Sequence, residues 1–379
     1  MTQAPLQTPL IVLAAGGTGG HVFPAEALAN ELGRRGFRLA LITDRRGDAY
    51  GGVLGELETH RIRAGGVAGK NIFARIKSAI ELAIGTLQAR SLLKKLNPKT
   101  VIGFGGYASV PTMLAACFGK YKTALHEQNA VLGRANRLLA PRVDRVATCF
   151  DAIEGVPEQA RGNIVQTGMP VRDSVMRIGA QSYPDLDCDS VVRVLIIGGS
   201  QGARVLSDVV PAAIGLLSEA QRKRLHVTQQ CRPEDLERVR KVYTDLAVDA
   251  ELDTFFPDVP ERLAASHLLI GRCGASTVAE VTVIGRPSIL IPYPHAIDDH
   301  QAKNAHAVDE AGAGWLMPEM AFTAEALAKR LGSLMDMPTT LIKAAACAKA
   351  VGKPQAAENL ADMICGLLEN DPGHGREAA

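Results

Sequence analysis

The stretch Leu10-Ile-Val-Leu-Ala-Ala-Gly-Gly-Thr-Gly-Gly-His21 decides the fold class, because an apolar run leads directly into a glycine-rich turn that ends on a histidine. The apolar run is typical of a buried β-strand, and glycine lets the following turn adopt positive φ angles and approach a ligand closely. The N–H groups at the start of the next helix attract negative charge. We therefore predict a phosphate-binding loop with a titratable group at its end.

Strand and helix patterns alternate through the rest of the chain. In the first half we expect strands at 10–15, 39–43, 100–104, 123–126 and 145–149, and helices at 25–35 and 72–93. The second half opens like the first, with an apolar strand at 191–197 followed by Gly198-Gly-Ser-Gln-Gly-Ala203. This alternation predicts an α/β protein with two Rossmann-like domains of doubly wound parallel sheets. Both glycine loops are expected to face a cleft between the domains.

The length of 379 residues also favours two domains, since one domain usually has roughly 100 to 200 residues. We expect the join near residues 168–173 or in the segment 182–190, and we favour a crossing at Pro170–Arg172. The predicted domains are residues 1–171 and 172–351. A helix within about 352–379, with its apolar pattern at 357–368, is expected to pack back on the first domain.

Composition excludes several classes of protein. The formal net charge of +2 lacks the basic surplus of nucleic-acid binders. Seven cysteines without a C-x-x-C pair indicate neither a disulfide framework nor a zinc site, and the N-terminus does not read as a secretion signal. Residues 100–119 carry no charge, but their glycines and Pro111 divide them into strand, turn and short helix, so we predict no transmembrane helix.

Polar residues that follow the expected strands are the candidate site. His21, at a helix start, is available as a neutral base that takes a proton from a hydroxyl, or else is only a polar cap. The run His126-Glu-Gln-Asn129 ends a strand, and its amide and carboxylate groups suit sugar hydroxyls better than they suit an ordinary turn.

The segment Gly271-Arg-Cys-Gly-Ala-Ser-Thr-Val-Ala-Glu280 follows an expected strand at 267–270. Ser276 and Thr277 either cap the next helix or receive a diphosphate, and Glu280 suits a ribose diol. No metal site is expected, because Asp185, Asp187 and Asp189, although spaced like a metal-binding motif, lie in the linker region and read as a solvated loop.

A stripe of apolar residues recurs at helical spacing between residues 72 and 87. Its members are Ile72, Phe73, Ile76, Ile80, Ala83, Ile84 and Leu87, with Lys70, Arg75 and Lys77 interspersed. A core face is the favoured interpretation. The alternative is a basic amphipathic helix on an anionic membrane, extended by Phe118, Lys120, Tyr121 and Lys122.

The motifs taken together closely resemble the MurG family, the bacterial peptidoglycan glycosyltransferases with a GT-B fold. The resemblance runs in order from about residue 10 to residue 360, through the segments 16–24, 105–107, 126–129, 168–172, 198–203, 271–280 and 299–301. It implies transfer of N-acetylglucosamine from UDP to the 4-hydroxyl of the muramic-acid sugar of undecaprenyl-diphosphate-linked lipid I, which gives lipid II with inversion at the anomeric carbon.

The resemblance also implies roles for individual residues. His21 or Glu127 would be the general base. Donor contacts would come from Thr18, Gly19, Gly20, Asn129, Arg172, Ser200, Phe256, Ala275, Ser276, Thr277, Val278, Ala279, Glu280, His300 and Gln301. The acceptor diphosphate would lie against Gly16, Gly17, Gly105, Gly106 and Tyr107.

No tightly bound cofactor is implied, since UDP-N-acetylglucosamine is a substrate. The expected location is the cytoplasmic face of the inner membrane, as a peripheral protein, with cell-wall synthesis and division proteins as further partners. Three alternatives stay open. A non-hydrolysing UDP-sugar epimerase shares the expected architecture, a non-catalytic module would only bind the nucleotide sugar, and an NAD-dependent oxidoreductase is disfavoured because the third fingerprint glycine is missing.

Overall fold

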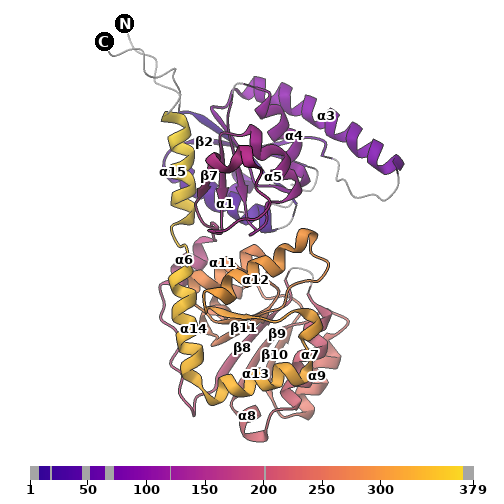
Figure 1. Ribbon diagram of the computed structural model, residues 1–379, viewed down its shortest axis with the longest axis vertical. Helices are drawn as coiled ribbons and strands as arrows, with labels where there is room; N and C mark the ends of the chain where they lie inside the picture. Colours follow the sequence, from indigo (N-terminus) through magenta and orange to yellow (C-terminus); the bar gives the residue numbers. More distant parts are fainter. Residues whose placement is uncertain are drawn as a thin grey trace. The chain divides into compact units, whose positions relative to one another are not determined.

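The computed structural model describes residues 8–17, 19–44, 52–64, 72–119, 121–199 and 202–369. The chain forms two compact units, whose elements are labelled in Figure 1. Unit 1 contains the residues up to Arg172 and those from Gln355 onward, and unit 2 is Asp173–Pro354. The chain therefore enters unit 2 after Arg172 and returns to unit 1 near its C-terminus.

Unit 1 is built on a seven-stranded parallel sheet with the order β3-β2-β1-β4-β5-β6-β7. Its strands are β1 (Leu10–Ala14), β2 (Arg38–Thr43), β3 (Glu58–Arg61), β4 (Thr100–Gly103), β5 (Lys122–Glu127), β6 (Arg145–Thr148) and β7 (Ile164–Gln166). Its helices are α1 (Gly19–Arg34), α2 (Gly52–Glu56), α3 (Ile72–Leu96), α4 (Gly106–Cys117), α5 (Arg134–Leu139) and α15 (Ala356–Glu369), with 3-10 turns at Ala140–Arg142 and Glu158–Asn163.

Both faces of this sheet are buried, which is why β1 is apolar throughout. Along β1, Val12 packs into one core and Leu13 into the other. Helix α15 adds Leu360 and Ile364 to the second core, beside residues of α1. A 2.6 Å ion pair between Arg35 and Asp362 also joins these helices, so the C-terminal helix is an integral part of unit 1.

Unit 2 has a six-stranded parallel sheet with the order β10-β9-β8-β11-β12-β13. Its strands are β8 (Val192–Ile197), β9 (Leu225–Gln230), β10 (Asp249–Asp253), β11 (Leu268–Gly271), β12 (Ser288–Leu290) and β13 (Gly314–Leu316). Its helices are α6 (Asp173–Gly179), α7 (Arg204–Gly215), α8 (Glu219–Lys223), α9 (Leu236–Asp245), α10 (Val259–Ala265), α11 (Ala275–Ile284), α12 (His300–Glu310), α13 (Ala324–Asp336) and α14 (Pro338–Val351), with 3-10 turns at Ile297–Asp299 and Glu319–Ala321.

Each sheet has one point where the strand order reverses direction, between β1 and β4 in unit 1 and between β8 and β11 in unit 2. Ligands of such sheets bind beyond the carboxyl ends of the strands at these switch points. The glycine motifs of the sequence follow these same four strands.

The first helix begins earlier than the sequence predicts. We expected it at 25–35, after Pro24, but α1 begins at Gly19 and contains Pro24. A proline removes only one donor from the helix, and packing overrides that cost here. The same occurs at Pro111 in α4 and Pro211 in α7. His21 is therefore the third residue of a helix.

The apolar stripe of α3 does not form a core face, so the favoured interpretation was wrong. Its members Ile76, Ile80 and Leu87 are 52%, 54% and 67% exposed. The helix instead buries its line of small and apolar residues, including Ala89 and Leu93, and Figure 1 shows α3 lying along α4 and extending beyond it. Within the described residues, none of the helices is both long and apolar enough to span a membrane.

Candidate active site

The switch point of unit 1 brings two glycine turns against the His21 ring. Gly17 follows β1 with a φ of +99°, and Gly105 and Gly106 follow β4 with φ values of +83° and +70°. A Cβ atom on Gly106 would lie 3.2 Å from His21 Cδ2, and one on Gly105 would lie 3.4 Å from Cε1. The ring thus packs on backbone that only glycine supplies.

The side chain of Gln128 holds the same histidine from the other side. Its Oε1 lies 3.2 Å from His21 Nδ1, while its Nε2 donates to the Phe104 carbonyl at 2.8 Å. The same Nε2 lies 3.0 Å from Nδ1 of His126. His126 is completely buried, and this burial lowers the pKa of its imidazole to about 4.

Glu127, the other candidate base, is engaged by its own loop. It is buried, and Oε1 accepts from the backbone and side-chain nitrogens of Asn129 at 3.0 and 3.3 Å. Its Oε2 accepts from the Gly133 N–H and from Asn136 Nδ2, both at 2.8 Å. Four donors around one carboxylate are the arrangement of a residue that shapes a turn.

The remaining candidates of unit 1 lie near the start of α1 or on its neighbours. The Arg172 guanidinium stacks over the ring of Phe23, two residues after His21, at 4.9 Å from the ring centroid. Tyr107 is exposed on the first turn of α4. Gly16 is packed so closely that a Cβ atom there would lie 2.5 Å from Ala108 Cβ. Gly19 and Gly20 open α1, and Thr18 lies outside the described residues.

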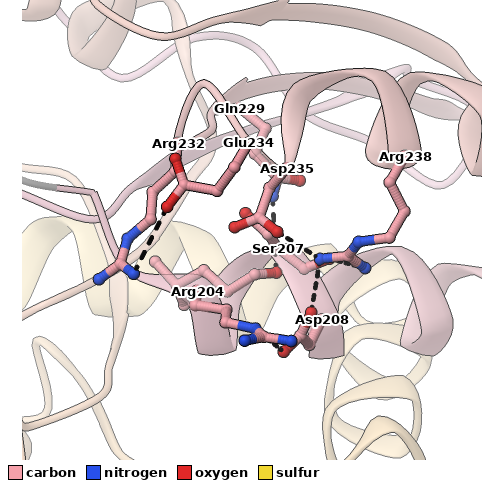
Figure 2. Close-up of polar contacts among 9 residues, drawn as sticks. Arg204, Ser207, Asp208, Gln229, Arg232, Glu234, Asp235 and Arg238 are labelled. Atoms are coloured by element: carbon pink, nitrogen blue, oxygen red, sulfur yellow. Dashed lines mark hydrogen bonds and ion pairs between the residues drawn. The ribbon is translucent and has the colours of Figure 1, made fainter.

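In unit 2 the loop between β8 and α7 repeats the glycine pattern. Gly199 and Gly202 have φ values of +84° and +68°, and Ser200 lies outside the described residues. A Cβ atom on Gly202 would lie 2.9 Å from Cγ of Arg232, whose side chain therefore packs on this loop. Figure 2 shows Arg232 paired with Glu234, and a separate group in which Arg238 joins Asp208 at 2.6 Å and Asp235 at 2.8 Å.

Helix α11 begins at the second loop of this switch point. Its N-cap is Gly274, so Ser276 and Thr277 occupy the first turn, and the interpretation of these hydroxyls as caps was wrong. The Ser276 Oγ atom is buried and has no hydrogen-bond partner among the described residues. Glu280 is buried one turn further along the helix. A buried hydroxyl in the first turn of a helix that has no protein partner is available to hydrogen-bond a ligand.

The other donor candidates follow β10 and β12. The Phe256 ring is buried beneath the Arg262 guanidinium at 4.2 Å. Gln301 Oε1 accepts from the Tyr293 N–H at 2.9 Å, and His300 Nδ1 lies 2.8 Å from the Ile297 carbonyl oxygen. These two residues begin α12 and hold the loop before it.

Two features of the site were not predicted from the sequence. Arg272, between β11 and α11, bonds the Pro292 carbonyl at 3.0 Å and pairs with Glu319 at 2.6 Å, which fixes the loop after β12. Gln128 was seen only as part of a polar run.

In the linker region, the Asp187 carboxylate accepts from Ser190 Oγ at 2.6 Å and closes a local turn. The described parts of the chain contain no group of three acidic, histidine or cysteine residues arranged for a metal ion.

Comparison with known proteins identifies the family. The Glycosyltransferase family 28 N-terminal domain matches residues 11–148, and the C-terminal domain of that family matches residues 193–360. A protein of Paramagnetospirillum magneticum named UDP-N-acetylglucosamine--N-acetylmuramyl-(pentapeptide) pyrophosphoryl-undecaprenol N-acetylglucosamine transferase is 57% identical over 367 residues, which cover 97% of this chain and 99% of the relative. The chain belongs to the MurG family.

Solved structures agree with membership in the MurG family. MurG of Acinetobacter baumannii is 27% identical, with a TM-score of 0.76, 94% coverage of this chain and 99% of that one. A UDP-GlcNAc 2-epimerase from Neisseria meningitidis shares the fold at 14% identity, with a TM-score of 0.65, 94% coverage of this chain and 99% of that one. The chain thus has the GT-B architecture of two Rossmann-like parallel-sheet domains, and its enzyme class is that of the MurG glycosyltransferases.

Proposed function

We propose that this chain transfers N-acetylglucosamine from UDP-N-acetylglucosamine to the 4-hydroxyl of the N-acetylmuramyl-pentapeptide on undecaprenyl diphosphate. The product is lipid II, the disaccharide precursor of peptidoglycan, formed with inversion at the anomeric carbon. The observation that carries this proposal is the 57% identity, over nearly the whole of both chains, to a relative whose name states this donor and acceptor.

Unit 2 binds most of the donor in this proposal. The loop around Ser200 and the first turn of α11 receive the diphosphate, and the buried, unpartnered Ser276 hydroxyl supports that assignment. Other contacts are proposed for the uracil through the backbone of Phe256, for the ribose through Glu280 and for the sugar through His300 and Gln301. The residues Ala275, Thr277, Val278 and Ala279 surround the diphosphate and ribose, and Thr18, Gly19, Gly20, Asn129 and Arg172 complete the donor contacts.

Unit 1 binds the acceptor and handles its proton. The acceptor diphosphate lies against the turns at Gly16–Gly17 and Gly105–Gly106, beside Tyr107. His21 takes the proton of the acceptor 4-hydroxyl while that oxygen forms a bond to the anomeric carbon. The bond from that carbon to the UDP oxygen breaks, and loop N–H groups and a helix N-terminus stabilise the charge on UDP. Glu127 shapes the loop, and no tightly bound cofactor takes part.

Helix α3 is the proposed contact with the membrane that carries the lipid acceptor. Its exposed Ile76, Ile80 and Leu87, with Lys77 among them, suit the interface of an anionic bilayer. We propose that the protein is peripheral on the cytoplasmic face of the inner membrane, where proteins of cell-wall synthesis and division are its further partners.

Vesicle sedimentation tests the membrane contact. In an I76S/I80S double variant, binding to vesicles of anionic phospholipid should fall, while I342S, which changes an exposed isoleucine on α14, should bind as the parent does. Equal binding of all three proteins would remove α3 from the proposal.

The decisive experiment for the function is transfer of labelled N-acetylglucosamine from UDP onto a lipid I analogue in detergent. The proposal expects a labelled disaccharide lipid and one UDP per transfer. Incubation with UDP-N-acetylglucosamine alone is the second arm, since formation of a new UDP-sugar would favour the epimerase. A protein that binds UDP yet transfers nothing under varied detergent conditions would overturn the proposed function.

A further inference from the structure

A network of hydrogen bonds connects buried groups of the unit 1 site. It joins the Phe104 carbonyl, the Gln128 amide, the His126 imidazole and the His21 imidazole. Phe104 and His126 are fully buried, and Gln128 is nearly so. These groups therefore bond to one another in the interior of the unit.

The donor and acceptor of each hydrogen bond in this network follow from groups that can only donate or only accept. A carbonyl oxygen only accepts, so the atom of Gln128 that lies 2.8 Å from the Phe104 carbonyl is its NH₂ nitrogen. The second hydrogen of that nitrogen is shared between His126 Nδ1 at 3.0 Å and the His126 carbonyl oxygen at 3.2 Å, so Nδ1 faces a group that only donates. The amide oxygen then lies 3.2 Å from His21 Nδ1, and as an acceptor it requires a proton on that nitrogen.

The neutral state of His126 keeps the Gln128 amide in this orientation. Its Nδ1 accepts from Gln128, so the ring is neutral and its proton sits on Nε2, 3.5 Å from the Gly168 carbonyl oxygen. Burial holds the pKa of His126 near 4, and burial also raises the pKa of the Cys149 thiol that lies 3.6 Å from Nε2. If His126 were charged, its Nδ1 would donate, and the Gln128 oxygen would have to turn away from His21.

We infer that Gln128 is a positioning residue that fixes His21 as the tautomer protonated on Nδ1, so that Nε2 is the nitrogen that takes the acceptor's proton. This inference rests on the proposed function of the site. The Nε2 edge of the ring lies at Gly106, since a Cβ atom there would be 3.4 Å from Nε2. The proton-accepting nitrogen is thus on the turn assigned to the acceptor diphosphate.

The proton balance of the step is simple. The acceptor hydroxyl gives its proton to Nε2 as its oxygen bonds to the anomeric carbon, and His21 becomes an imidazolium with protons on both nitrogens. Gln128 Oε1 accepts from Nδ1 before and after this transfer. The hydrogen bond becomes charge-assisted once the ring is protonated, which stabilises the product of the transfer.

The tautomer is measured by two-bond ¹⁵N–¹H NMR of the full-length protein labelled at its nine histidines, with His21→Gln identifying the His21 signals. The parent protein should show Nδ1 protonated and Nε2 bare. Gln128→Met should lose this preference, and its kcat should fall about ten-fold with little change in the KM for either substrate, which is the size expected of an orienting partner.

Gln128→Glu separates positioning from a structural role. Both variants lose the amide NH₂ that bonds Phe104 and His126, but glutamate, protonated on the oxygen that faces the Phe104 carbonyl, keeps an oxygen acceptor facing His21. The inference expects Gln128→Glu to retain the Nδ1-protonated ring and to have a higher kcat than Gln128→Met. Equal loss in both variants would reduce Gln128 to a packing residue and overturn the inference.

Gln229→Met is the matched control in unit 2. Gln229 is also fully buried and accepts from the Tyr243 hydroxyl at 2.6 Å, so its replacement should cost a similar amount of stability and leave the His21 signals unchanged. A proton on Nε2 in the parent protein would also overturn the inference. Because the NMR measurement needs no turnover, it stays decisive even if the parent protein fails to transfer the sugar.

Discussion

The switch points of the two units share one topology and differ in chemistry. In unit 1 the groups beyond β1, β4 and β5 are titratable or amide side chains bonded to one another, with His21 and Gln128 at the centre. In unit 2 the loops after β8 and β11 contain no histidine, Arg272 there pairs with Glu319, and the buried Ser276 hydroxyl beside them has no described partner. A shared fold thus gives both units a switch point, and in the proposed function the few residues after each strand decide whether that unit moves a proton or holds an anion.

Replacement of His21 should have the largest effect. We expect His21→Gln to lower kcat about 10³-fold, because a positioned general base contributes roughly 10² to 10⁴. Binding of UDP-N-acetylglucosamine, measured by calorimetry, should change little. His306→Gln, on the exposed side of α12, is the control. Near-normal transfer by His21→Gln would move proton abstraction away from His21.

Lowering the pH should reduce the stability of unit 1, because the folded state holds His126 neutral. The folded pKa near 4 lies below the usual 6.5, so the unfolded state binds more protons between these values and stability falls as the pH drops from 6.5 to 4. The full loss is about 3 kcal/mol. Hydrogen exchange of unit 1 amides at several pH values should show it, and His126→Gln should lack it. An unchanged pH slope in that variant would contradict the assignment.

A methyl group placed against the His21 ring should reduce kcat without a large fall in the free energy of unfolding. Gly106→Ala places a Cβ atom 3.2 Å from His21 Cδ2, and misplacing a catalytic group costs about 10²-fold in rate. Gly36→Ala is the matched control, since its φ is +83° and no atom lies within 4 Å of the new Cβ. Both variants should lose about 1 kcal/mol of stability by denaturant titration, yet only Gly106→Ala should lose activity.

The smallest effect is expected in unit 2. Ser276→Ala should weaken UDP binding by about five- to ten-fold, the contribution of one hydrogen bond, with kcat nearly unchanged. Its melting temperature should stay level or rise, because a buried hydroxyl without a described partner is removed. Ser333→Ala, exposed on α13, controls for the substitution. If Ser276→Ala lowered kcat and left UDP affinity unchanged, the proposed difference in role between the two units would be contradicted.

The strands of the first half could be predicted because their apolar runs are continuous. The five expected there each agree with the structure within one residue at either end, and β8 within one residue of its expected start. Strands β3, Glu58–Arg61, and β7, Ile164–Gln166, were missed because both are short and only partly buried at the two edges of the sheet. The start of α1 was missed because Pro24 was taken as a boundary.

The exposed face of α3 shows a different limit of sequence patterns. Helical spacing reveals that Ile76 and Ile80 share a face, but the same spacing describes a core face and a surface face. Only the packing of the helix through Ala89 and Leu93 shows which line of residues is buried. The polar run at 126–129 is similar, since its sequence does not say which side chains bond to one another.

The sequence by itself determined the α/β class, the two glycine loops and the residues from which the site is drawn, because these depend on periodicity and on backbone freedom at particular positions. The tertiary structure decided the rest. That Gln128 faces His21 across 107 residues of chain, and that Glu127 is taken up by its own loop, follows from which strands are neighbours in the sheet. Hydrogen bonds between distant residues have direction and partners that only the folded arrangement specifies.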